Sequence, residues 1–292
     1  MLSILIPTYN TKIVKLVDDL YSQCKNLNLD FEILCYDDGS SYVYKEFNRK
    51  ITDYKRVVYK EMDKNHGRAK LRNFLANEAK YKKLLFLDAD SGIIRDEFIF
   101  TYIKQMNKDV IYGGRLYFEN KPEDINKVLH WKYGKEKESL KVETRNQNPY
   151  LNFLSNNFLI DKDVFERVKF DEKLSGYGYE DTLFAYELKK NNIKIRHIDN
   201  PVLHLELENA SAFLQKTENA MKNLAGLYAQ NKITDTRLIQ TYKKLKKFGL
   251  TGIFKKIVFA LKGPFKKNLY SSNPDLRFLQ CYKLALFIKY LE

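Results

Sequence analysis

The 292-residue sequence lacks any apolar run approaching the 18 residues that a membrane-spanning helix needs. Its first residues, Met1 to Pro7, have neither a basic start nor a small-residue cleavage site, so they predict a strand rather than a signal peptide. Its three cysteines, Cys24, Cys35 and Cys281, are scattered without metal-binding spacing, which indicates packed thiols in a reducing cytoplasm. With 44% hydrophobic and 30% charged residues, the chain is expected to be globular.

Glycine-rich phosphate loops are missing as well. The chain has 12 glycines, but neither a G-x-G-x-x-G nor a Walker A motif follows the first apolar run. That run ends in Pro7-Thr8-Tyr9-Asn10, which lacks the glycines that let a backbone approach a pyrophosphate. A bound diphosphate would therefore have to be held by a metal ion and by side chains.

The pattern of apolar residues predicts alternating strands and helices. Strands are expected at 2–6, 31–36, 56–60 and 84–87, and helices at about 11–27, 42–51 and 66–80. This order with short connections is typical of an α/β fold whose mostly parallel sheet is flanked by helices. Ligands of such sheets bind beyond the carboxyl ends of the strands. The polar segments that follow three of these strands should meet there.

The strand at 84–87 ends in Asp88-Ala89-Asp90, around which the chemistry is organised. Two neighbouring carboxylates repel each other unless a cation or hydrogen-bond donors satisfy them. Carboxylate oxygens suit Mg²⁺ or Mn²⁺, which proteins often share with a substrate phosphate. The motif therefore predicts a metal–diphosphate site, with a solvated acidic turn as the alternative.

Six short motifs occur in a fixed order along residues 1–205. They are Pro7-Thr8-Tyr9-Asn10, Asp37-Asp38-Gly39-Ser40, Asn65-His66-Gly67 with Arg72-Asn73, Asp88-Ala89-Asp90, Asn156-Asn157-Phe158 and Gly176-Tyr177-Gly178-Tyr179-Glu180-Asp181. In this order they resemble the motifs of family 2 glycosyltransferases. The resemblance implies a GT-A fold and an enzyme that transfers a sugar from a nucleotide-sugar donor with inversion.

The resemblance assigns the donor site to the first strand ends. It places Pro7, Thr8 and Tyr9 at the nucleotide, with the Tyr9 ring stacked on the base, and it makes Asp38 an acceptor for uracil. The alternatives are a turn tyrosine packed on the next helix and an aspartate that serves as a helix cap or Asx turn. The fork of Arg72 suits diphosphate oxygens, although the residue could also belong to a solvated helix face; Arg68 is a weaker choice.

The resemblance also implies a metal site. Asp90 would bind Mn²⁺ or Mg²⁺ directly, and Asp88 would bind the ribose or metal-bound water. His204 corresponds to a third metal ligand in part of the family. His197 is an alternative that fits better as a packed strand residue.

The remaining assignments concern the sugars. An inverting transfer needs a general base, and Asp181 has the position of the family's base. Glu180, Asn156 and Gly178 are expected at the acceptor or donor sugar. Tyr177 replaces the tryptophan common in this family, which puts its stacking on the acceptor in doubt. Trp131, the one tryptophan, lies in the variable region where acceptors bind, with ordinary packing as the alternative.

Positive charge is concentrated at the end of the chain. Residues 232–292 carry 14 basic and three acidic side chains, whereas residues 1–231 carry 37 and 34. Lysine pairs beside Phe, Ile and Leu are typical of helices that lie on an anionic membrane surface, although they would also fit a helical cap with solvated lysines. No nucleic-acid-binding signature is present, so nucleic acid is not expected as a partner.

We therefore expect a GT-A domain over 1–231 and a basic helical region over 232–292. The domain would contain a nucleotide-binding half (1–110), an acceptor-binding half (111–206) and a helical extension (207–231). The predicted activity is metal-dependent hexosyl or N-acetylhexosaminyl transfer, from a UDP-sugar as the favoured donor, to a glycan or lipid-linked acceptor of surface polysaccharide. The protein would be cytoplasmic or peripheral on the inner face of the cell membrane. A nucleotidyltransferase and a non-catalytic glycan- or membrane-binding module are the alternatives.

Overall fold

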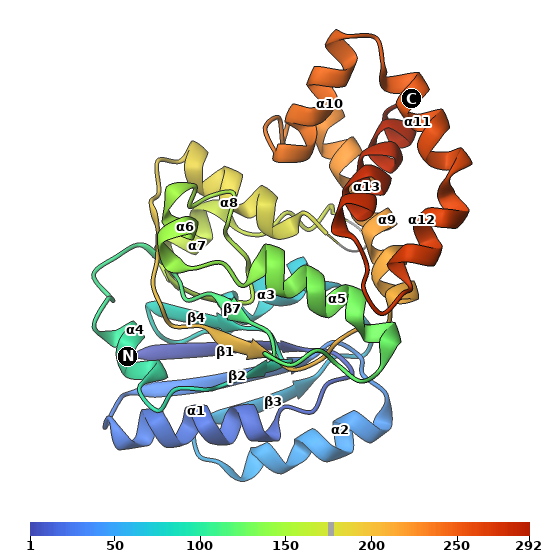
Figure 1. Cartoon of the computed structure of the whole chain (residues 1–292). Helices are drawn as coiled ribbons and strands as arrows, with labels where there is room; N and C mark the ends of the chain where they lie inside the picture. Colours follow the sequence, from blue (N-terminus) through green and yellow to red (C-terminus); the bar gives the residue numbers. More distant parts are fainter. Residues whose placement is uncertain (175–177) are drawn as a thin grey trace. The chain divides into compact units, whose positions relative to one another are not determined.

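The computed structural model describes residues 1–174 and 178–292, which form two compact units (Figure 1). The sheet unit comprises Met1–Tyr117, Glu138–Lys173 and Phe184–Glu206. The helical unit comprises Phe118–Lys137, Leu174–Leu183 and Leu207–Glu292. The predicted division of the chain at residue 231 stays a prediction.

A seven-stranded sheet forms the centre of the sheet unit, in the order β3-β2-β1-β4-β8-β6-β9. Its strands are β1 (Leu2–Thr8), β2 (Phe31–Asp37), β3 (Val57–Glu61), β4 (Lys83–Leu87), β6 (Val110–Tyr112), β8 (Asn157–Asp161) and β9 (Ile195–His197). β1 pairs in parallel with β2 and β4, whereas β8 is antiparallel to β4 and β6. A smaller sheet joins β5 (Ser91–Gly92), β10 (Val202–His204) and β7 (Arg115–Leu116). The predicted mostly parallel sheet is confirmed.

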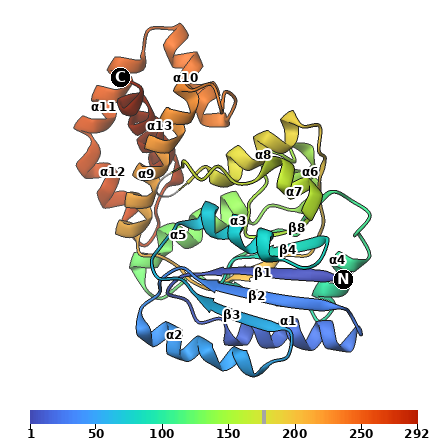
Figure 2. The same cartoon turned by 180° about the vertical axis from the view of Figure 1, so that it is seen from behind.

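Helices cover both faces of this sheet (Figures 1 and 2). On one face α1 (Val14–Asn26) and α4 (Phe98–Ile103) bury an aliphatic core against β1 and β2. On the other face α3 (Arg68–Glu78), α7 (Lys162–Val168) and the part of α8 (Glu180–Lys190) from Phe184 onward bury an aromatic core against β4 and β8. Strands buried on both faces explain the continuous apolar runs of the sequence. The sheet is thus a rigid support for the residues at its edge.

One predicted helix differs in detail. The helix expected at 42–51 ends at Asn48 as α2 (Tyr42–Asn48) and continues as the 3₁₀ turn η1 (Arg49–Asp53). The buried Asn48 amide binds the Thr11 carbonyl and the Ile13 N–H group, which fixes the chain between β1 and α1. Asp161 directly precedes α7, and its side chain pairs with Lys83.

The helical unit contains η2 (Ile125–Lys127), α5 (Val128–Tyr133), a π-helical turn η3 (Gly134–Glu138) that ends at the sheet unit, and five C-terminal helices. These are α9 (Ala210–Ala229), α10 (Arg237–Lys247), α11 (Thr251–Ala260), α12 (Lys262–Leu269) and α13 (Leu276–Leu291). Pro264 lies in the first turn of α12, where proline is tolerated. None of the described helices is both long and apolar enough to cross a membrane.

Candidate donor and metal site

The ends of β1 and β2 are tied together at the carboxyl edge of the sheet. The Asp38 N–H donates to the Thr8 carbonyl at 2.8 Å, and the Asn10 N–H donates to Ser40 Oγ at 2.7 Å. Tyr9 lies between them with 52% of its surface exposed. A side chain so exposed is not packed against a neighbouring helix. Tyr9 therefore offers a ring on a fixed turn, and its stacking on a base stays a prediction.

Asp38 fixes the loop that precedes α3. Its carboxylate accepts the backbone N–H groups of His66 at 2.8 Å and Gly67 at 2.9 Å. Gly67 has a φ of 88°, a left-handed conformation that glycine adopts without strain. Asp38 is thus a loop-positioning residue in this structure. Its predicted contact with a base is not tested by these bonds, because each carboxylate oxygen can accept more than one hydrogen bond.

Arg72 does not lie on a solvated helix face. The residue is 1% exposed and donates from Nη2 to Asp88 Oδ1 at 2.7 Å. Its guanidinium carbon lies 5.3 Å from the centre of the Phe170 ring. The Nε and Nη1 atoms are buried and have no hydrogen-bond partner among the described residues. An incompletely satisfied guanidinium beside the metal motif is what a diphosphate would need.

Sequence reasoning missed a second arginine at Asp88. Arg115, on β7, donates from Nη2 to Asp88 Oδ2 at 3.2 Å and from Nη1 to Glu138 at 3.2 Å. Tyr117 also donates to Glu138, at 2.6 Å. Burial favours neutral Arg115, but the charges of Tyr117, Glu138, Asp90 and Asp88 hold its pKa well above the ordinary value. Asp88 therefore lies between two cations.

The turn before Arg115 contains the signal that could have found it. A Cβ atom on Gly113 would lie 2.4 Å from the Asn200 carbonyl oxygen and 2.5 Å from Asn157 Nδ2. Gly114 has a φ of 106°. The Gly-Gly pair thus lets the chain turn tightly beside Asn157, whose amide binds the Gly114 and Asn200 carbonyls at 3.0 and 2.9 Å. Asn157 is a structural residue of this turn.

Asp90 and His204 face each other. Asp90 Oδ2 lies 3.4 Å from His204 Nδ1, and β10, which carries His204, pairs with β5 directly after Asp90. Burial favours the protonated carboxyl, but the hydrogen bond and charge of His204, with the charges of Arg115 and Arg68, hold the pKa of Asp90 below its ordinary value. The Oδ1 atom of Asp90 is buried without a hydrogen-bond partner among the described residues.

This pair fits a divalent metal that is completed by a ligand. No group of three His, Cys, Asp or Glu side chains suited to a metal occurs in residues 1–174 and 178–292. Asp90 and His204 would therefore supply two ligands, while Arg72 and Arg115 occupy Asp88. Mn²⁺ and Mg²⁺ commonly keep few protein ligands and take the others from phosphate and water. The orphaned Oδ1 atom of Asp90 is consistent with this arrangement.

Asn156 lies beside the same carboxylates. Its carbonyl accepts the Asp88 N–H at 2.9 Å, and its Oδ1 atom accepts the Tyr112 hydroxyl at 3.3 Å. Its Nδ2 atom is buried without a hydrogen-bond partner in the described part of the chain. An unused amide donor at this position can bind a sugar hydroxyl or a phosphate oxygen. His197, the alternative metal ligand, packs in β9, and its imidazole bonds to the Pro149 carbonyl at 2.9 Å.

The other predicted residues belong to the helical unit. Asp181 and Glu180 begin α8, and Glu180 accepts the Gly178 N–H at 3.1 Å. Gly178 approaches α9 closely, since a Cβ atom there would lie 2.5 Å from that of Ala220. Tyr177 lies outside the described residues.

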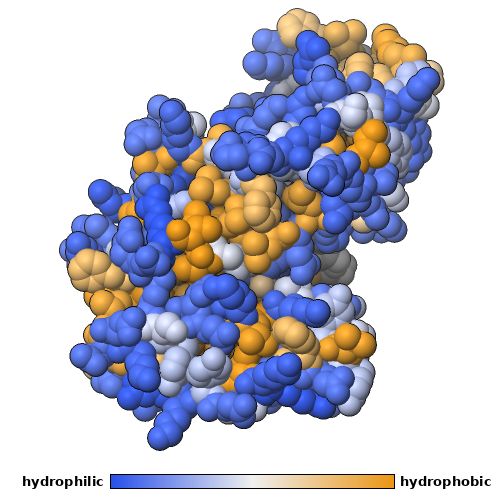
Figure 3. Space-filling model, turned by 60° about the horizontal axis from the view of Figure 1, so that its bottom comes forward, coloured by the Kyte–Doolittle hydropathy of each residue, from blue (hydrophilic) through white to orange (hydrophobic). Residues whose placement is uncertain are grey.

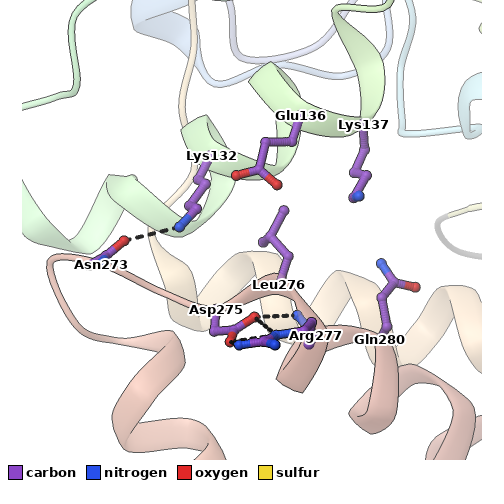
Figure 4. Close-up of a pocket in the computed structure, with 8 residues that line it drawn as sticks. All are labelled: Lys132, Glu136, Lys137, Asn273, Asp275, Leu276, Arg277 and Gln280. Carbon is purple, nitrogen blue, oxygen red and sulfur yellow. Dashed lines mark hydrogen bonds and ion pairs between the residues drawn. The ribbon is translucent and has the colours of Figure 1, made fainter.

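Trp131 lies on α5 of the helical unit and donates to the Phe118 carbonyl at 2.8 Å. The next residue, Lys132, lines an open pocket of about 440 Å³ (Figure 4). Its lining residues are Lys132, Glu136, Lys137, Asn273, Asp275, Leu276, Arg277 and Gln280. Lys132 donates to Asn273 at 3.0 Å, and Arg277 pairs with Asp275. The pocket is thus polar and of mixed charge.

The sheet order and the edge residues define a GT-A-like α/β fold. The chain belongs to glycosyl transferase family 2, whose model matches residues 3–168. The mannosyltransferase PcManGT from Pyrobaculum calidifontis, solved in complex with GDP-Man and Mn²⁺, matches 99% of this chain and 86% of its own, with a TM-score of 0.62 and 14% identity. S. aureus TarS 1–349 in complex with UDP-GlcNAc matches 99% and 89%, with a TM-score of 0.52 and 18% identity. At these identities the likeness shows a shared fold. No curated protein matches the chain.

Proposed function

We propose that the protein is a metal-dependent inverting glycosyltransferase with a nucleoside-diphosphate-sugar donor. The observation that carries this proposal is the cluster of Asp90, His204, Asp88 and Arg72 at the carboxyl edge of a family 2 sheet. The neighbours with GDP-Man and UDP-GlcNAc support a nucleotide-sugar donor, and a UDP-sugar is our first choice. A nucleotidyltransferase and a non-catalytic module are less favoured, because family 2 membership argues for sugar transfer.

In the proposed donor site, different residues bind the base and the diphosphate. Tyr9 would stack on the base, with Pro7, Thr8 and Asp38 shaping its surroundings. Arg72 would donate its unused Nε and Nη1 hydrogens to the diphosphate, and Asn156 would donate to a phosphate or sugar oxygen. A bound Mn²⁺ or Mg²⁺, held by Asp90 and His204, would offset the negative charge that develops on the leaving diphosphate.

The proposed transfer is a single displacement. Asp181 takes the proton of an acceptor hydroxyl as the hydroxyl oxygen attacks the anomeric carbon. The new bond between this carbon and oxygen forms on the side opposite the bond to the β-phosphate oxygen. The bond to the phosphate oxygen breaks as the new bond forms, so the configuration at the anomeric carbon is inverted. The nucleoside diphosphate leaves with both electrons of the broken bond. Glu180 and Gly178, together with Tyr177 and Trp131, would shape the sugar site.

The acceptor is proposed to be a glycan or lipid-linked sugar of a surface polysaccharide, and the enzyme to be cytoplasmic or peripheral on the inner face of the membrane. The polar pocket that Lys132 lines supports a hydroxyl-rich acceptor, because it presents amide, carboxylate and ammonium groups (Figure 4). Incubation with UDP- and GDP-hexoses and N-acetylhexosamines, with and without Mn²⁺, tests the activity. The anomeric configuration of product by NMR then tests inversion. If the enzyme turned over nucleotides without a sugar but none of these nucleotide sugars, the proposal would be contradicted.

A further inference from the structure

The segment that forms α10, α11 and α12 is uniformly basic. Residues 236–274 contain ten Lys or Arg and no Asp or Glu. Seven of these lysines are exposed, on all three helices: Lys243, Lys244, Lys246, Lys247, Lys256, Lys262 and Lys267. One lysine is neutralised from outside the segment, since Lys255 pairs with Glu292. The remaining positive charges have no acidic neighbour along the segment.

A row of apolar side chains runs along α11 among these lysines. Leu250, Ile253, Ile257 and Leu261 recur at helical spacing and are 42%, 59%, 54% and 44% exposed. Val258 of the same helix is 3% exposed and belongs to its packed face. Large aliphatic residues so aligned on a surface usually mark an interaction site. Figure 3 shows hydrophobic residues interspersed among hydrophilic ones on the visible face of these helices.

The turn between α10 and α11 adds an aromatic residue. Phe248 is 71% exposed, and the Gly249 that follows it has a φ of 68°. This left-handed residue ends α10 and lets the chain reverse beside Phe248. An exposed aromatic ring at the end of a basic amphipathic helix is well suited to the interface between lipid headgroups and acyl chains.

We propose that the α10–α12 surface, formed by Phe248, the α11 row and the seven exposed lysines, binds the surface of a membrane that contains anionic lipid. The aliphatic row would enter the acyl boundary, and the lysines would lie at the phosphate groups. Each lysine near an anionic surface strengthens binding about fivefold. The proposal concerns docking, and it does not depend on the reaction catalysed.

The chemistry of this surface disfavours two other occupants. A second copy of the chain would bring like charges together, which opposes association. A nucleic acid would match the lysines, but it would leave the aliphatic row of α11 in water. Lipid satisfies both components of the surface.

Vesicle sedimentation tests the proposal with the full chain. We expect binding to phosphatidylcholine vesicles that contain about one-third phosphatidylglycerol, weaker binding at high salt, and little binding to phosphatidylcholine alone. The variant Ile253→Gln/Ile257→Gln should weaken binding about tenfold or more, because it removes apolar insertion and leaves every charge in place. The variant Lys256→Gln/Lys267→Gln should weaken binding about fivefold for each lysine and leave less salt dependence.

The matched control is Val43→Gln/Val58→Gln, which removes two exposed apolar residues from the sheet unit. It should bind vesicles like the wild type. Far-UV circular dichroism of each variant verifies the fold, and an isoleucine variant that unfolds is replaced by Phe248→Gln, in an exposed turn. Equal binding to neutral and anionic vesicles would overturn the proposal. So would a preference for RNA over vesicles, or a lipid-free dimer that the isoleucine variant dissociates.

Discussion

Arg72 and Asp88 form a buried ion pair in which the arginine is only partly used. Nη2 of Arg72 lies 2.7 Å from Oδ1 of Asp88, while its buried Nε and Nη1 have no hydrogen-bond partner among the described residues. Leaving buried donors unsatisfied costs about 1–3 kcal/mol in an ordinary site. A diphosphate bound at this edge would satisfy them. The pair thus couples the metal motif to the proposed donor.

We predict that Arg72→Lys weakens nucleoside-diphosphate binding by roughly 10- to 100-fold, because a lysine cannot reproduce the fork of charge-assisted donors. Isothermal titration in the presence of Mn²⁺ measures the change. Arg49→Lys is the matched control, since Arg49 is an exposed arginine paired with Glu61. Unchanged affinity in Arg72→Lys would show that this guanidinium does not contact the ligand.

Asp181→Asn should lower kcat by about 10²- to 10⁴-fold, which is the range for removal of a general base. Nucleotide affinity should remain within about twofold of the wild type, because the carboxylate is assigned to the acceptor hydroxyl. Single-turnover transfer and titration of the nucleotide separate the two effects. If Asp181→Asn transferred sugar at the wild-type rate, another residue would have to be the base.

The turn that carries Arg115 should tolerate no side chain at Gly113. A Cβ atom there would lie within 2.5 Å of three neighbouring groups, so Gly113→Ala should lower the free energy of unfolding by about 1–3 kcal/mol and displace Arg115. Gly252→Ala, on α11 with no atom within 4 Å of the added methyl, should be neutral or stabilising by about 0.5–1 kcal/mol. Urea unfolding of both variants checks this contrast. Equal stabilities would contradict the packing of the turn.

His197 makes stability depend on pH. Burial is the largest cause that lowers its pKa, which falls to about 4 even though the Pro149 carbonyl favours the proton; Arg145 lowers it further. The unfolded chain therefore binds a proton between pH 6.5 and 4 that the folded protein does not. The stability contribution is complete above pH 6.5, and about 3 kcal/mol of it is lost as the pH falls to 4.

Denaturant unfolding of the wild type and His197→Gln at pH 7 and pH 4 measures this loss. The wild type should lose about 3 kcal/mol more than the variant, because glutamine does not titrate. Arg145 and Tyr112 face the imidazole, and Asn146 accepts the backbone N–H of His197; all three remain in both proteins. Parallel losses would show that His197 is protonated equally in the folded and unfolded states.

The sequence was sufficient for the four strands β1 to β4 of the seven-stranded sheet. Apolar runs located β1, β2 and β4 because these strands are buried on both faces, and Asp90 followed from its place after β4. Arg115, Glu138 and Tyr117 were missed because they are distant in sequence from Asp88. Arg115 binds both Asp88 and Glu138, and Tyr117 binds Glu138, through tertiary contacts that no local pattern encodes. The hydrogen bonds that Asp38 accepts from the His66 and Gly67 N–H groups could not be predicted for the same reason.

The central claim is that Asp90 holds a metal on which donor binding depends. Titration of UDP and GDP in the presence and absence of Mn²⁺, on wild type and Asp90→Asn, tests it most directly. We expect one of the nucleotides to bind the wild type with Mn²⁺ at least about tenfold more tightly than without it, and Asp90→Asn to lose that gain. Tight binding that is independent of Mn²⁺, or a metal effect that survives in Asp90→Asn, would contradict the account.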